Sequence, residues 1–135
     1  MALVVLILSA CATPAAPNDH PYLAVVQTDC APWDGAAFTL SIPFDTGRLV
    51  RVSIYQSPHL QHRVTFSFPD PTGRVGEASF HPEFGPVAAL KGTVTFQAVQ
   101  EGIPFQGEFD LQSTDGMHLR GHFDATWVDR QALCG

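Results

Sequence analysis

The stretch Leu90–Trp127, LKGTVTFQAVQEGIPFQGEFDLQSTDGMHLRGHFDATW, decides the fold. Apolar and polar residues alternate through its three segments, Leu90–Ala98, Ile103–Ser113 and Met117–Trp127. Alternation with a period of two is typical of strands that bury one face. The connections between the segments are short, and each of them ends in glycine. The stretch therefore predicts an antiparallel meander.

The second connection predicts the register of its hairpin. A three-residue loop, Thr114–Gly116, suits a hairpin whose glycine adopts the left-handed conformation. It places Leu111 opposite Leu119 and keeps the apolar residues on one face, whereas a two-residue turn would place Leu111 opposite Arg120 and mix the faces. The predicted pairs are Leu111–Leu119, Phe109–Gly121 and Gly107–Phe123.

The first connection predicts a four-residue loop, Val99–Gly102. This loop gives the pairs Ala98–Ile103, Phe96–Phe105 and Gly92–Phe109. We therefore expect the Phe109 ring to lie between Gly92 and Gly121, which have no side chains to compete with it. Two outward rows follow from the same register, namely Lys91–Asp110–Arg120 and Thr93–Glu108–His122. We interpret Asp110–Arg120 and Glu108–His122 as exposed contacts that contribute little to stability.

Upstream of this meander the chain also alternates in short segments, separated by residues typical of turns. The predicted strands are Tyr22–Gln27, Ala36–Pro43, Val50–Ile54, Val64–Phe68 and Val75–Phe80, with loops at Gln56–Gln61 and His81–Ala89. About eight strands without a helical period predict an all-β fold, either an antiparallel β-sandwich or a small β-barrel, in one domain. The short connections favour a meander at the C-terminal end.

The first residues carry an export pattern. Leu3–Leu8 is an unbroken apolar run, and Leu8-Ser9-Ala10-Cys11 follows it. This stretch resembles the signal peptide and lipobox of bacterial lipoproteins. The resemblance implies that residues 1–10 are removed and that Cys11 carries the lipid, palmitate included. It also implies a protein on the bacterial envelope, and we expect the outer membrane, facing the periplasm.

Residues 11–21 contain three prolines and read as a tether, so residues 22–135 form the β domain. No apolar run approaches the ~20 residues of a spanning helix, so lipid alone is expected to hold the protein at the membrane. With Cys11 assigned to lipid, Cys30 and Cys134 are expected to form a disulfide in an oxidising compartment. Trp33 and Trp127 are near these cysteines in sequence, and we expect both in the core.

Charge and composition limit the possible partners. The chain has 13 acidic and 7 basic residues and a net charge of −6, which argues against nucleic acid as a partner. An apolar fraction of 45% with 10 phenylalanines is enough for a hydrophobic core. Phenylalanine in this number favours a filled interior over a cavity.

Candidate catalytic and metal-binding residues are few. His118 and His122 would lie about 13 Å apart on one strand, too far to share one zinc ion. His59 and His62 lie in or beside a loop without a neighbouring acidic ligand, and His81 stands alone. A serine nucleophile elbow and a glycine-rich phosphate loop are both missing. We therefore predict no metal, no cofactor, no catalytic residue and no enzymatic activity.

The sequence favours a lipid-anchored envelope protein whose β domain binds or scaffolds a protein partner, through loops such as Gln56–Gln61 and His81–Ala89. One alternative is a lipocalin-like carrier of a small apolar ligand, which requires an unfilled barrel. Another is a protein similar to the lysozyme inhibitors, which are small, acidic, disulfide-bonded β-barrels on a lipid anchor. That similarity is one of architecture alone.

Overall fold

The computed structural model describes residues 20–135, and the predicted signal peptide with Cys11 and most of the tether lies outside them. The described part is all-β, as predicted, and contains no helix. Its strands are β1 (Tyr22–Cys30), β2 (Ala36–Asp45), β3 (Arg48–Ile54), β4 (His59–Leu60), β5 (Val64–Phe68), β6 (Gly76–His81), β7 (Ala88–Phe96), β8 (Val99–Gln100), β9 (Phe105–Ser113) and β10 (His118–Trp127).

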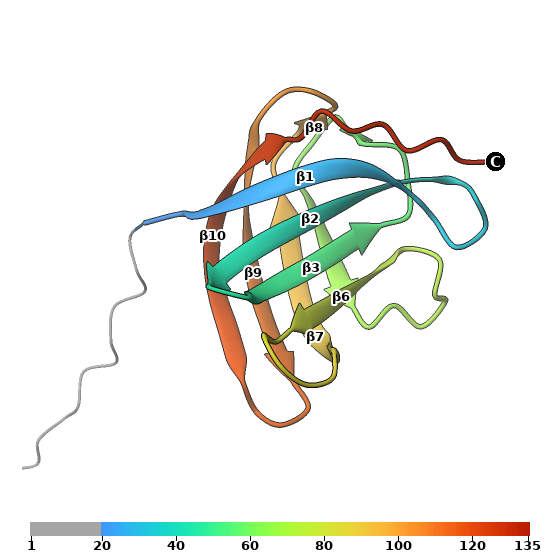
Figure 1. Cartoon of the computed structure of the whole chain (residues 1–135). Coiled ribbons are helices and arrows are strands. Elements are labelled where there is room, and N and C mark those ends of the chain that lie inside the picture. The colour runs from blue at the N-terminus through green and yellow to red at the C-terminus, as the bar shows by residue number, and fades with distance from the viewer. Residues whose placement is uncertain (1–19) are drawn as a thin grey trace, which may run out of the picture.

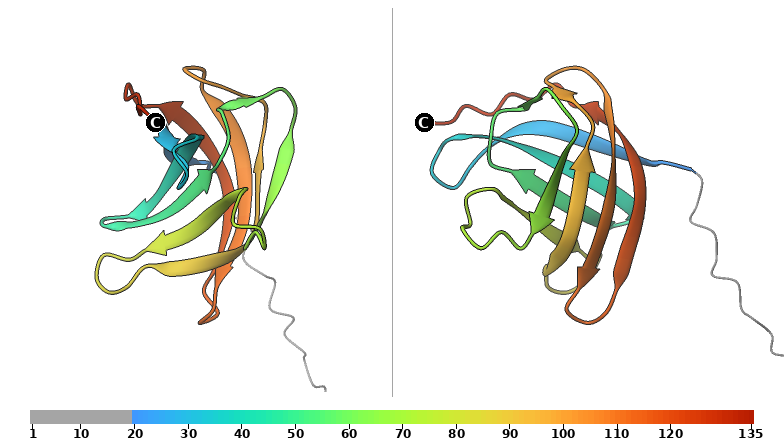
Figure 2. Two further views of the ribbon diagram at one scale, coloured as in Figure 1. Left: turned by 90° about the vertical axis from the view of Figure 1, so that its right-hand side faces the viewer. Right: turned by 180° about the vertical axis from the view of Figure 1, so that it is seen from behind.

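Seven strands close into a barrel (Figures 1 and 2). The order is β7-β6-β3-β2-β1-β10-β9, and β9 pairs back onto β7, while β5 is an extra strand on the edge of β7. Every pair in the ring is antiparallel except β1–β10, which is parallel. The expectation of a purely antiparallel sheet was therefore wrong at this pair. In a closed ring with an odd number of strands, directions cannot alternate all the way round, so one neighbouring pair must be parallel.

The β9–β10 hairpin confirms the predicted register. Leu111 lies opposite Leu119, and Phe109 lies opposite Gly121. The Ser113 amide donates to the Met117 carbonyl at 2.9 Å, and Gly116 has φ 93°. The three-residue loop therefore forms as expected, with its glycine in the conformation that other residues avoid.

The β7–β9 register was predicted wrongly by two residues. Phe96 lies opposite Gly107, and Phe109 lies opposite Val94 rather than Gly92. The reason is that residues 99–102 do not form a simple four-residue loop. Val99–Gln100 forms the short strand β8, which pairs with β4. β4 itself lies inside the segment 56–61, which was expected to be a loop. A shift of two residues leaves every side chain on its predicted face, so the hydrophobic pattern did not reveal it.

Gly92 occupies a different role from the one predicted. It has φ +133°, and a Cβ there would lie 2.0 Å from the Asp110 carbonyl oxygen. At this residue β7 pairs with Phe68 of β5, whereas Ala88 and Ala89 pair with β6. Glycine is thus required where β7 changes its partner along one edge.

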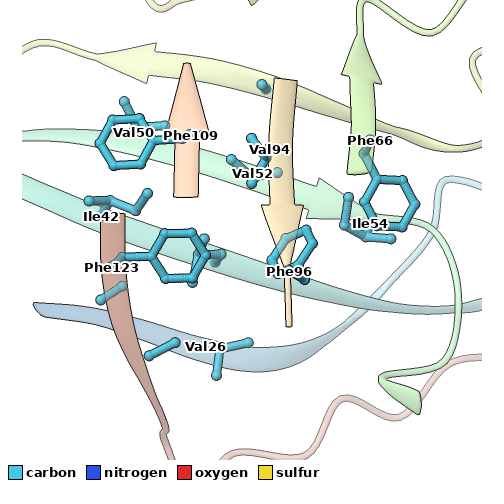
Figure 3. Packing of buried hydrophobic residues seen from close by; sticks show 14 of the residues in the cluster. Val26, Ile42, Val50, Val52, Ile54, Phe66, Val94, Phe96, Phe109 and Phe123 are labelled. Carbon is cyan, nitrogen blue, oxygen red and sulfur yellow. The ribbon is translucent and has the colours of Figure 1, made fainter. Parts of the chain in front are cut away.

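The barrel interior is filled with side chains (Figure 3). The largest fully buried residues are Phe38, Phe96, Phe123, Leu40, Ile42, Ile54 and Leu111. A second aromatic group forms where Tyr22 packs on Phe44 and Phe109, with ring centroids 4.8 and 5.6 Å apart. Contacts of this kind both bury apolar area and fix ring orientation.

The tryptophans do not both join this core. Trp33 is 51% exposed and packs edge-on against Tyr55, so its assignment to the core was wrong. Trp127 is half-buried against Phe105, and its Nε1 donates to the Ile103 carbonyl at 3.0 Å.

The predicted disulfide between Cys30 and Cys134 is present, with a Cα–Cα distance of 5.5 Å. It fastens the C-terminal tail to the end of β1, beside the parallel β1–β10 pair. The Thr28 hydroxyl donates to the Arg130 carbonyl at 2.9 Å and accepts from the Ala132 amide at 3.0 Å. The tail after β10 is therefore held by hydrogen bonds as well as by the covalent link.

Candidate functional site

The outer face of the barrel carries a groove of about 560 Å³ over β3, β6 and the start of β7. We call it the β6 groove. It is open to solvent and lies outside the filled interior. Its lining residues are Arg51, Tyr55, Pro69, Asp70, Gly73, Gly76, Glu77, Ala78, Ser79, His81, Val87, Ala89 and Leu90.

The groove exists because β5 and β6 share one edge of β7. β6 pairs with β7 through Ser79 and Phe80, and from Gly92 onward the same edge of β7 pairs with β5. The first residues of β6, 76–78, pair with β3 and have no partner on β7 within the described chain. The barrel wall is therefore split beside the start of β6.

The connection between β5 and β6 forms one wall of the groove and is held by Asp70. The Asp70 carboxylate accepts the amide hydrogens of Thr72, Arg74 and Val75 at 3.1, 2.8 and 2.7 Å. These hydrogen bonds, the one from Val75 above all, lower the pKa of the Asp70 carboxyl. An ionised aspartate thus organises a turn that has no regular secondary structure.

Polar side chains from two strands meet on the floor. The outward side of β6 carries Glu77, Ser79 and His81. Arg51 of β3 lies directly opposite Ser79. The Ser79 hydroxyl lies 3.0 Å from Nε2 of His81. Arg51 makes no ion pair with any residue from 20 to 135.

The charges around the floor act on its titratable groups. Burial lowers the pKa of His81, the positive charge of Arg51 lowers it further, and Glu77 opposes both. The His81 ring is therefore neutral at pH 7, and its Nε2 can accept the Ser79 hydroxyl hydrogen. Burial also raises the pKa of Tyr55, and the neighbouring Glu77 carboxylate adds to this shift.

Near Tyr55, a chain of side-chain hydrogen bonds links strands β1, β2 and β3. The Thr39 hydroxyl donates to Asp29 at 2.7 Å, so its oxygen is left to accept from the Ser53 hydroxyl at 3.0 Å. Thr39 and Ser53 are buried although they point away from the barrel interior. Cross-strand bonds of this kind fix β1, β2 and β3 relative to one another.

The histidines considered from the sequence lie elsewhere, except His81. Asp110 accepts from Arg120, as predicted, and also contacts His118, with Nε2 2.5 Å from Oδ1. Lys91 is not in this row, because the corrected register places it opposite Gln112.

Glu108 lies opposite His122 as predicted, but its carboxylate accepts a hydrogen bond from Arg63, which was not predicted to contact it. Within residues 20–135 no three His, Cys, Asp or Glu side chains are grouped to hold a metal ion.

Sequence reasoning missed the β6 groove. Ser79 and His81 are two residues apart, a spacing that puts both side chains on one face of a strand, so the pair could have been found. Arg51 could not, because its position opposite Ser79 depends on the pairing of β3 with β6 across 21 intervening residues that include β4 and β5.

Comparison of the chain with protein-family models, with curated proteins and with solved structures gives no match. A search of the described residues for a helix of sufficient length and apolarity to cross a membrane finds none.

Proposed function

We propose that this chain is a lipid-anchored protein of the bacterial envelope whose barrel acts as a binding module, with the β6 groove as its binding surface. The observation that carries the proposal is the convergence of a hydroxyl, an imidazole, a carboxylate and an arginine without an ion-pair partner among residues 20–135 in one solvent-facing groove. A few polar groups placed in a concave site are typical of ligand-binding sites. The filled interior supports a ligand on the outside of the barrel rather than the carrier alternative.

Anchoring rests on the motif Leu8-Ser9-Ala10-Cys11. The Cys30–Cys134 disulfide supports export, because disulfides persist in oxidising compartments such as the periplasm. In this arrangement the barrel is held at the outer membrane by the lipid on Cys11. Replacement of Cys11 by alanine should abolish labelling of the expressed protein by a fatty-acid analogue and release it from the membrane fraction. A mutant that is still labelled and still sediments would refute the anchor.

The Ser79–His81 contact resembles the nucleophile–base contact of hydrolases, but we assign it to binding. No carboxylate hydrogen-bonds His81 among residues 20–135, and a hydrolase also needs donors aimed at a developing oxyanion. The proposal therefore treats the serine and the histidine as ligand contacts.

The groove is tested with a matched pair of surface variants of the full chain. Val87 lines the groove and is 55% exposed, whereas Ile103 is 53% exposed and does not line it. Both positions tolerate a long side chain without disturbing the core. We expect V87R to lose a partner that the wild-type chain captures from bacterial envelope extract, and I103R to retain it. Retention of every captured partner by V87R would refute the groove as the binding surface.

A further inference from the structure

We propose that the β6 groove binds an oxyanion group of its ligand, a carboxylate or a phosphate, through Arg51, Ser79 and His81. This inference rests on the proposed function and names the chemistry that the groove recognises. It concerns a single anionic group on an organic ligand, because the apolar side chains of Val87 and Ala89 flank the polar floor.

The state of Arg51 is the first reason. Arg48, Arg63 and Arg120 each contact a carboxylate. Arg51, Arg74 and Arg130 have no ion-pair partner in the described chain, and of these three only Arg51 lines the β6 groove. A guanidinium presents several donors in a plane that matches the two oxygens of a carboxylate or phosphate. The exposed Arg51 guanidinium therefore has its donors free for an anionic group that enters the groove.

The placement of Ser79 and His81 is the second reason. Directly opposite residues of an antiparallel pair have Cβ atoms about 5 Å apart, so Ser79 is within reach of a group bound to Arg51. His81 lies on the same face of β6, and its Nε2 is 3.0 Å from the Ser79 hydroxyl. One oxyanion can thus contact a guanidinium and a hydroxyl at once.

Protonation of His81 couples this site to pH. In the neutral tautomer without a hydrogen on Nε2, the ring accepts the Ser79 hydroxyl hydrogen, which is then not available to an anion. The protonated ring is itself a donor at Nε2, so it releases the Ser79 hydroxyl and adds a positive charge beside Arg51. Glu77 on β6 favours protonation and Arg51 on β3 opposes it. Tyr55 and Asp70 each hydrogen-bond to Val75, just before β6, whereas His81 is its last residue. A bound anion offsets the charge of Arg51 and so raises the pKa of His81. By linkage, affinity for the anion rises as pH falls through that pKa.

The test follows the His81 imidazole of the purified full chain by NMR, with benzoate and phenyl phosphate as two separate probes. We expect at least one probe to raise the pKa of His81 and to bind more tightly at lower pH. A response to benzoate alone identifies a carboxylate site, and a response to phenyl phosphate alone identifies a phosphate site. If neither probe changes the titration of His81, the inference is refuted.

Two arginine variants make the test specific. R51Q should weaken binding by about tenfold or more, the loss expected for a hydrogen bond to a charged group. R63Q is the control. Arg63 is exposed, precedes β5, contacts Glu108 of β9 and does not line the β6 groove, so R63Q should leave binding unchanged. Equal binding by R51Q and the wild type would overturn the inference. If V87R still loses its partner while both probes fail to bind, the groove binds a ligand without an oxyanion, so the proposed function stands and this inference falls.

Discussion

Phe96 should be the most sensitive position of the barrel. Its side chain is fully buried, and its ring centroid lies 5.7 Å from those of Phe38 and Phe66, 5.9 Å from Phe105 and 6.0 Å from Phe123. Replacing a buried phenylalanine by alanine removes transfer free energy and leaves a cavity, at a loss of about 3–5 kcal/mol. Each aromatic pair adds about 0.5–1.5 kcal/mol beyond area burial, so we expect F96A near the upper end of that range.

Urea denaturation measures this loss. With a slope of about 1.5 kcal/mol per M, a loss of 3–5 kcal/mol moves the midpoint down by about 2–3 M. Phe84 supplies the control, since it is 86% exposed, and F84A should change stability by less than about 0.5 kcal/mol. F96L should fall between the two and remains measurable if F96A does not fold. A loss below about 1 kcal/mol for F96A would show that the ring is not packed as described.

Two further predictions concern the tail and the outer face. Reducing the Cys30–Cys134 disulfide, whose cysteines are 104 residues apart, should lower the free energy of unfolding by up to about 4.7 kcal/mol through the greater entropy of the unfolded chain. Rapid alkylation of both thiols in the unreduced native protein would contradict the bridge. A double-mutant cycle on Asp110 and Arg120 should give a coupling below about 1 kcal/mol that shrinks in high salt, because the pair is exposed. The hydrogen bond from His118, followed by the positive charge of Arg120, lowers the pKa of Asp110. The small coupling is therefore present at neutral pH and disappears as pH falls through that lowered pKa, and a coupling that grows on acidification would refute it.

The two C-terminal hairpins show what determines whether register can be predicted. The β9–β10 register follows from a local rule, because its loop is three residues long and a one-residue change would mix the faces. The β7–β9 register depends on β8, whose partner β4 lies about 40 residues upstream. Alternation determines on which face each side chain lies, but it cannot distinguish two registers that differ by two residues. The predicted register therefore placed Asp110 opposite Lys91 instead of Thr93, without moving any core residue to the outer face.

The β6 groove was missed entirely, and the same distinction separates the part of it that could have been predicted from the part that could not. Properties of one strand, such as the shared face of Ser79 and His81, are present in the sequence. Properties of two strands, such as the position of Arg51 opposite Ser79, require the pairing of β3 with β6. The parallel closure of β1 on β10 is also of this second kind, since it follows from the number of strands in the ring rather than from any local pattern.

The β6 groove forms because two strands, β5 and β6, pair with the same edge of β7. β5 and β6 both pair with the same side of β7, and the chain between them must leave that side and return. Gly92 permits the close approach of the Asp110 carbonyl at the change of partner, and Asp70 fixes the departing turn by accepting backbone amides. Their role is to leave the start of β6 open beside Arg51, so that a polar site forms on the outside of a barrel whose interior has no room for one.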